Sequence, residues 1–93
     1  MRIGLLGFGT VGRGVYELVS RRTDMEIGAV LCRRELALGD VRVTHDFADI
    51  LNDASIDTVV EAIGGVHPAC EYVQAAILAG KNVATSNKAL MAH

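Results

Sequence analysis

Short apolar runs alternate along the chain with segments whose apolar residues recur at helical spacing. The first run, Ile3 to Leu6, stops at Gly7, as a strand that enters a turn would. Beyond Gly7 the apolar period becomes that of a helix, which we expect to end near Arg21 and Arg22. The helical positions are Val11, Val15, Leu18 and Val19.

Four further apolar runs have the length and the bounding polar residues of strands. These predicted strands are Met25 to Cys32, Arg42 to Thr44, Asp57 to Ile63 and Asn82 to Thr85. The first of the four alternates imperfectly, which is typical of a strand covered on both faces. The charged segment from Arg33 to Asp40 predicts a loop.

Helix signals lie between the later strands and after the last one. Asp46 has the character of an N-cap for a brief helix whose apolar face begins with Phe47. Pro68 fits the first turn of a longer helix, and Gly80 fits the C-cap of that helix. A further helix is predicted from Asn87 to His93.

Three glycines at the junction of the first strand and the first helix have G-x-G-x-x-G spacing. Gly7 would make the turn, Gly9 would let a pyrophosphate approach the backbone, and Gly12 would let the helix lie close to the strand. The N-terminus of that helix would then face the phosphates. A glycine-rich loop that binds nothing is the alternative, and the strand before and helix after favour a dinucleotide site.

Strands and helices alternate along the whole chain, which predicts an α/β domain with parallel strands and right-handed crossovers. Together with the glycine turn, this predicts a Rossmann-type doubly wound sheet of about five strands in the order 3-2-1-4-5. The fold is incomplete, because that architecture has a sixth strand and its enzymes carry a separate substrate domain. We therefore expect residues 1–93 to be the N-terminal portion of an NAD(P)-binding domain, without the substrate and catalytic domain.

Composition and charge narrow the range of partners that the chain can bind. The 93 residues are 51% hydrophobic but only 4% aromatic, so the core must be aliphatic, which suits a sheet buried on both faces. The net charge is −2 and basic residues form no run, so we expect neither nucleic acid nor a membrane as partner. No apolar segment approaches the roughly 20 residues that span a bilayer, and no signal peptide is evident, so we expect a cytoplasmic protein.

Cysteine and histidine spacing gives no sign of a metal site. Cys32 and Cys70 lie far apart without a C-x-x-C motif, and we expect two reduced, buried thiols. His45 and His93 have no spaced partners. His67 stands at a predicted helix start, where we expect a surface or capping residue.

Two arginines follow the second predicted strand. An NAD enzyme would have an acidic residue there for the ribose 2′-hydroxyl, whereas this chain has Arg33 and Arg34. Two guanidinium groups favour a 2′-phosphate, so we expect NADP as the cofactor, with NAD as the alternative. The other interpretation is a solvated loop in which Glu35 pairs with either arginine.

Polar residues and glycines also follow the fourth and fifth strands. Glu61 is either a partnered buried carboxylate or a residue of the site, and the glycines at 64 and 65 permit a backbone turn against a ligand or form a plain loop. Residues 85–88 are polar and placed to meet a nicotinamide and a substrate, and Lys88 could hold a carboxylate or move a proton. The alternative for this segment is a helix cap at Ser86 or Asn87.

Four segments resemble the N-terminal part of the homoserine dehydrogenases, in family order and over the whole chain. They are GLLGFGTVGRGV, VVEAIGG, EYVQAAILAGKNV and ATSNKALMAH. The resemblance implies an oxidoreductase that interconverts L-aspartate 4-semialdehyde and L-homoserine with NAD(P)H, in threonine, methionine and isoleucine biosynthesis. We also expect a homo-oligomer.

Residue roles follow from the same resemblance, position by position. The pyrophosphate would be bound by Gly7, Gly9, Thr10, Val11 and Gly12. Arg33 would lie by the adenosine ribose, Gly64 near the cofactor, Thr85 and Asn87 near its nicotinamide half, and Lys88 at the active site as the catalytic residue.

The chain departs from the family in one respect, and two other interpretations of its function stay open. Family members continue into a substrate domain, so the small-molecule substrate would be bound by the complete enzyme, and we expect the 93-residue chain alone to be inactive. Oxidoreductases with an EKP motif after the fifth strand share the A-G-K-x-V pattern of residues 79–83, but Ser86, Asn87 and Lys88 stand here instead. A nucleotide-sensing module without catalysis is the alternative from another class.

Overall fold

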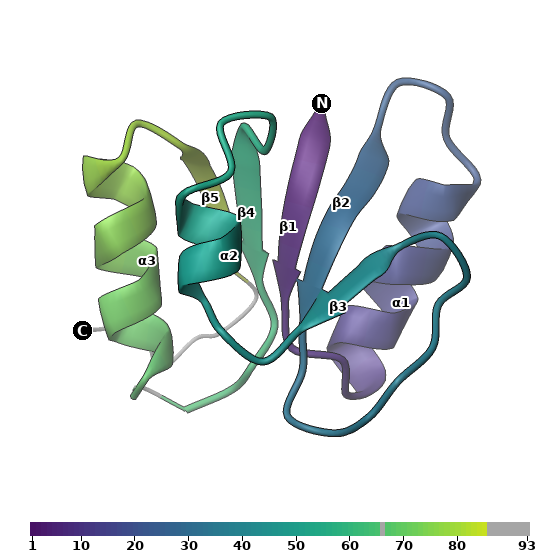
Figure 1. Ribbon diagram of the computed structural model, residues 1–93, viewed down its shortest axis with the longest axis horizontal. Coiled ribbons are helices and arrows are strands. Elements are labelled where there is room, and N and C mark those ends of the chain that lie inside the picture. The colour runs from purple at the N-terminus through teal and green to yellow at the C-terminus, as the bar shows by residue number, and fades with distance from the viewer. Residues whose placement is uncertain (66, 86–93) are drawn as a thin grey trace.

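The computed structural model describes residues 1–65 and 67–85 and forms one sheet with helices on both sides (Figure 1). In chain order the elements are β1 (Arg2–Leu6), α1 (Thr10–Ser20), β2 (Glu26–Leu31), β3 (Arg42–Thr44), α2 (Ala48–Leu51), β4 (Thr58–Glu61), α3 (Ala69–Leu78) and β5 (Asn82–Thr85). The predicted third and fifth strands have the observed bounds, and the other strands differ at their ends by one or two residues. The helix predicted from Asn87 to His93 lies outside the described residues.

All neighbouring strands pair in parallel, in the order β3-β2-β1-β4-β5, as predicted. The register aligns the carboxyl ends of four strands, so that Leu31, Leu6, Glu61 and Thr85 form one row across the sheet. This row marks the edge from which the turn into α1 and the loop into α3 emerge, at the bottom of the view in Figure 1.

The core lies on both faces of the sheet. Leu6 belongs to the cluster beneath α2 and α3, whereas its neighbour Leu5 belongs to the cluster beneath α1. Aromatic pairs support each face, because Phe47 stacks on Tyr72 on one side and Phe8 meets Tyr16 edge to face on the other. This two-sided burial accounts for the imperfect alternation of the strands, and the doubly wound arrangement is confirmed.

The fourth strand is shorter than predicted. Our expected strand ran to Ile63, but β4 ends at Glu61. The Glu61 carboxylate accepts hydrogen bonds from the backbone N–H groups of Ile63 at 2.6 Å and Gly64 at 3.3 Å. These two donors are therefore directed back to the side chain of Glu61 rather than to a neighbouring strand, so the ladder stops there.

Both predicted helix caps have physical counterparts. The Asp46 carboxylate accepts a hydrogen bond of 2.9 Å from the N–H of Ala48, the first residue of α2. Gly80 has φ of 82° after α3, and the N–H groups of Gly80 and Lys81 donate to Ile77 and Ala76 carbonyls, both at 3.0 Å. The hydrogen bonds of Gly80 and Lys81 form a Schellman motif. Glycine adopts the left-handed backbone conformation of this motif without the steric cost of a Cβ atom.

The segment between β2 and β3 is less open than a charged loop suggests. Leu36, Leu38 and Val41 pack against the cluster beneath α1, and Leu38 and Val41 form a β-bridge.

Among residues 1–65 and 67–85, no helix has the length and apolar character needed to cross a membrane.

Candidate functional site

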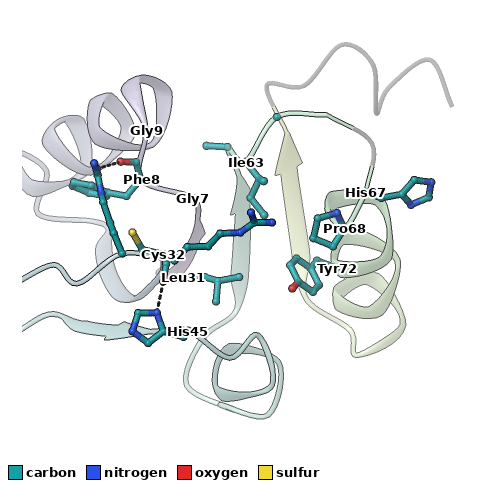
Figure 2. Close-up of a pocket in the computed structure, with 14 residues that line it drawn as sticks. Gly7, Phe8, Gly9, Leu31, Cys32, His45, Ile63, His67, Pro68 and Tyr72 are labelled. Carbon is teal, nitrogen blue, oxygen red and sulfur yellow. Dashed lines mark hydrogen bonds between the residues drawn. The ribbon is translucent and has the colours of Figure 1, made fainter.

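A cavity of about 590 Å³ opens at the carboxyl edge of the sheet, over the point where β1 separates β2 from β4. Its walls are the turn at Gly7 to Gly9, the end of β2 from Leu31 to Arg34 and the loop from Ala62 to Gly64. Pro68 and Tyr72 of the α3 end lie on the side opposite Phe8 and Gly9 (Figure 2). Ligands of open α/β sheets bind at this kind of position, where the strand order reverses.

The turn between β1 and α1 is built from two glycines that tolerate no side chain. Gly7 has φ of 98°, and its N–H donates to the Leu31 carbonyl at 2.8 Å. A Cβ on Gly12 would lie 2.2 Å from the Gly7 carbonyl oxygen. The start of α1 therefore lies directly on the turn, which agrees with the turn-making and close-packing roles expected of Gly7 and Gly12.

Gly9 differs, because a Cβ built there would meet no described atom within 4 Å. It is the N-cap residue of α1, no side chain of the described residues caps the helix, and the first turn holds no acidic residue. Thr10 and Val11 follow on the exposed surface. The positive end of the α1 dipole is thus bare beside the cavity, as an incoming anionic group requires.

Arg33 and Arg34 both line the cavity, but their hydrogen bonding differs. The Arg34 Nη2 donates to the Phe8 carbonyl at 2.6 Å, which joins the β2 end to the glycine turn. Arg33 is exposed and forms no hydrogen bond or ion pair with another residue of the described ranges. The expected alternative, local pairing with Glu35, is wrong, because Glu35 lies 3.4 Å from His45 instead.

His45 is a cavity residue that sequence reasoning missed. Its Nδ1 lies 2.7 Å from the Cys32 carbonyl oxygen (Figure 2). Its Nε2 lies 3.4 Å from a Glu35 carboxylate oxygen. A carbonyl oxygen only accepts, so Nδ1 is the donor to Cys32, and Nε2 pairs with the Glu35 carboxylate when it also carries a proton. Position alone could have indicated it, because His45 follows β3 as Arg33 follows β2. Cys32 and Cys70 are both free thiols; Cys32 is buried as expected, but Cys70 is only partly buried.

Glu61 is fully buried, which decides between its two interpretations in favour of a partnered carboxylate. Its Oε1 accepts from the Thr85 hydroxyl at 2.5 Å, and its Oε2 accepts from the two backbone N–H groups that end β4. Thr85 is thus turned toward Glu61. The remaining predicted residues of this segment, Ser86, Asn87 and Lys88, lie outside the described residues.

The loop after β4 carries two more predicted residues. Gly64 lines the cavity with φ of 88° and open space around its Cβ position. His67 is exposed, lines the cavity and contacts the Glu71 carboxylate, so it is a surface residue, as expected. The N-cap residue of α3 is Pro68, and His67 does not cap the helix. Within residues 1–65 and 67–85, no three His, Cys, Asp or Glu side chains are grouped as metal ligands would be.

Comparison with known proteins identifies the fold's relatives. Residues 7–93 match the family model for the NAD binding domain of homoserine dehydrogenase. The homoserine dehydrogenase of Methylobacillus glycogenes is 41% identical over 106 aligned residues, covering 99% of this chain and 26% of that protein. The crystal structure of a homoserine dehydrogenase from Thiobacillus denitrificans aligns with a TM-score of 0.85 and 36% identity, over 99% of this chain and 24% of that one.

A crystal structure of S. aureus homoserine dehydrogenase gives a TM-score of 0.86 at 32% identity, over 97% of this chain and 26% of that one. The chain spans about a quarter of the length of these relatives. The sequence match and the structural alignments therefore agree, and the chain belongs to the homoserine dehydrogenase family, in which it corresponds to the NAD-binding domain.

Proposed function

We propose that this chain is the cofactor-binding part of an enzyme that interconverts L-aspartate 4-semialdehyde and L-homoserine with NADP, in threonine, methionine and isoleucine biosynthesis in the cytoplasm. The observation that carries the proposal is the bare N-terminus of α1 at Gly9, beside a cavity in a chain of this family. The residues present suit a dinucleotide, because open space at Gly9 and an uncapped helix end together accept a pyrophosphate.

The pyrophosphate would lie on Gly7, Gly9 and the first turn of α1, where Thr10, Val11 and Gly12 present backbone N–H groups to it. When bound, the dinucleotide supplies or accepts the hydride, and the residues of this chain bind and orient it. We place its adenosine half toward Arg33 and Arg34 and its nicotinamide half toward Gly64, Thr85 and Asn87. The cavity walls, which run from the β2 end to the loop after β4, support this order at Arg33, Arg34 and Gly64.

Arg33 is the residue that we expect to select NADP over NAD. Arg34 already donates to the Phe8 carbonyl, whereas the guanidinium of Arg33 has no partner among the described residues and is available to a 2′-phosphate. A hydrogen bond to a charged group contributes roughly 1.5–3 kcal/mol, which is about ten- to a hundredfold in affinity.

Calorimetric titration of NADPH and NADH tests this selection. In Arg33→Ala, NADPH affinity should fall by about ten- to a hundredfold while NADH affinity stays unchanged. Arg21→Ala is the matched control, because Arg21 is exposed at the far end of α1 and its loss removes the same charge. Equal affinity for both cofactors in the parent chain would contradict NADP selection, and no affinity for either would overturn the proposed function.

Lys88 is the residue that we propose as the general acid or base, or as the group that holds the substrate. In the longer enzyme, Lys88→Ala should lower turnover of L-aspartate 4-semialdehyde by about 10²–10⁴-fold while NADPH affinity stays nearly unchanged. If the longer protein binds NADPH but does not turn over the semialdehyde, it is a nucleotide-sensing module instead.

A further inference from the structure

Glu61 is a buried acidic residue with an unusual set of partners. Its side chain is fully buried at the end of β4, and no lysine, arginine or histidine of residues 1–65 and 67–85 forms an ion pair with it. Buried carboxylates are normally paired with a cation or held by several donors, because an uncompensated charge is expensive inside a protein. Here three donors converge on the two oxygens: the N–H groups of Ile63 and Gly64 and the hydroxyl of Thr85.

These three donors come from two separate segments of the chain. Ile63 and Gly64 form the cavity wall after β4, and Thr85 ends the neighbouring strand β5, opposite Glu61 in the sheet register. One carboxylate therefore fixes the loop and the strand end relative to each other.

Ala62 and Ile63 of this loop pack against the two core clusters, but packing does little to hold Gly64. A Cβ on Gly64 would meet no described atom within 4 Å, and Gly64 is exposed with a left-handed backbone. Its hydrogen bond to Glu61 thus replaces the side-chain contacts that usually order a loop. The Glu61 carboxylate lies below the cavity wall and is closed off from the cavity itself.

We propose that Glu61 is a positioning residue: through Gly64 and Thr85 it sets the shape of the part of the cofactor site farther from Arg33, without touching the cofactor. The inference rests on the proposed function, which places the nicotinamide half of the dinucleotide in this part. It assigns to one buried side chain the alignment of the loop after β4 with the end of β5.

A carboxylate suits the position better than an amide, because a carboxylate only accepts hydrogen bonds. Glu61→Gln keeps the shape but brings an NH₂ group that faces either the backbone N–H donors or the Thr85 hydroxyl. At least one of the three interactions is then lost or reversed. Thr85→Val removes the hydroxyl that donates to Glu61, and Thr85→Ser restores a hydroxyl at the same place.

The experiment compares two probes by calorimetry: NADPH, and adenosine 2′,5′-bisphosphate, which lacks the nicotinamide half. In Glu61→Gln and in Thr85→Val, NADPH affinity should fall by about tenfold, whereas affinity for the bisphosphate should change by less than about threefold. Thr85→Ser should recover most of the NADPH affinity that Thr85→Val loses, because it restores the hydroxyl. The double variant should lose less than the sum of the two single variants, because both changes act on one hydrogen-bond network.

The outcomes separate this inference from the proposed function. If the parent chain binds neither probe, the proposed function fails and the inference fails with it. If the parent chain binds both probes and both variants lose affinity for the two probes equally, or for neither, Glu61 has a merely structural role and the inference is overturned. Thr85→Val keeps the test decisive if Glu61→Gln does not fold, because Thr85 is only partly buried.

Discussion

Gly9 and Gly12 lie three residues apart in the same turn, yet their surroundings are opposite. Open space surrounds the Cβ position of Gly9, whereas a Cβ on Gly12 would collide with the Gly7 carbonyl at 2.2 Å. We therefore expect Gly12→Ala to destabilise the fold by about 1–3 kcal/mol, since backbone must move to admit the methyl group. Gly9→Ala should leave the free energy of unfolding nearly unchanged and weaken NADPH binding by at least about tenfold.

Denaturant unfolding and NADPH titration of the two variants check this contrast. Gly14→Ala is the control, because Gly14 lies in the same helix with open space at its Cβ position, and alanine should stabilise the helix there by up to about 1 kcal/mol. A Gly9→Ala chain that binds NADPH like the parent would remove Gly9 from the cofactor site.

At the residue scale, sequence reasoning found the positions but not their partners. Arg33, Arg34 and Gly64 could be placed at the cavity because the carboxyl ends of parallel strands meet at one edge. Spacing carries no information on which acceptor a long side chain reaches. Arg34 therefore binds the Phe8 carbonyl and Glu35 binds His45, and neither contact was predicted.

The connection between α1 and β2 contains an ion pair with a pH-dependent effect. The Arg22 guanidinium donates two hydrogen bonds to the Asp24 carboxylate, at 2.8 and 2.9 Å, and lowers the pKa of Asp24 from 3.8 to about 2. A carboxyl group whose pKa is lower in the folded state stabilises the fold above its unfolded pKa, and this contribution is lost as the pH falls through the folded pKa. The contribution should therefore disappear between about pH 4 and pH 2.

Thermal unfolding as a function of pH tests the role of this pair. Asp24→Asn should melt below the parent chain at pH 7, and the difference in Tm should shrink as the pH is lowered from about 4 to about 2. Because both partners are exposed, high salt should also reduce the difference. Asp40→Asn serves as the control, since Asp40 is exposed and forms no ion pair within the described part of the chain. A Tm difference that is constant over the whole pH range would exclude the pair as its cause.

At the element scale, the sequence could predict strands and caps because both depend on local chemistry. The period of apolar residues, the Asp46 cap and the glycine at position 80 act within a few residues of themselves. The early end of β4 could not be predicted, because it depends on a carboxylate that folds back onto Ile63 and Gly64. The apolar residues of the segment 33–41 were overlooked for the same reason, since tertiary contacts with α1-side residues define their role.

For the molecule as a whole, the alternation of elements was enough to predict the sheet order, because right-handed crossovers leave few alternatives. The same strand order explains why the site lies at the carboxyl ends of the strands, beside the central strand β1. The coupling of that site to β5 through Glu61 was invisible in the sequence, where Glu61 and Thr85 are 24 residues apart.

The edge of the molecule at β5 leads to a prediction about association. In the sheet of the described residues β5 pairs only with β4, and Ile77 and Leu78 of the adjacent α3 are 59% and 89% exposed. An open strand edge beside exposed apolar side chains favours pairing with another chain. We expect the 93-residue chain to associate with itself, and Leu78→Glu to weaken that association by placing charge beside the edge.

Sedimentation and melting temperature over a range of protein concentrations measure this association. The parent chain should shift to larger species and higher Tm as concentration rises, whereas Leu78→Glu should shift much less. Leu18→Glu is the matched control, because Leu18 is 65% exposed on α1, on the other face of the sheet from α3. If Leu18→Glu weakens association as much as Leu78→Glu, the contact is not centred on the β5 edge. A compact monomer with a Tm independent of concentration would show that this edge and its apolar neighbours do not drive association.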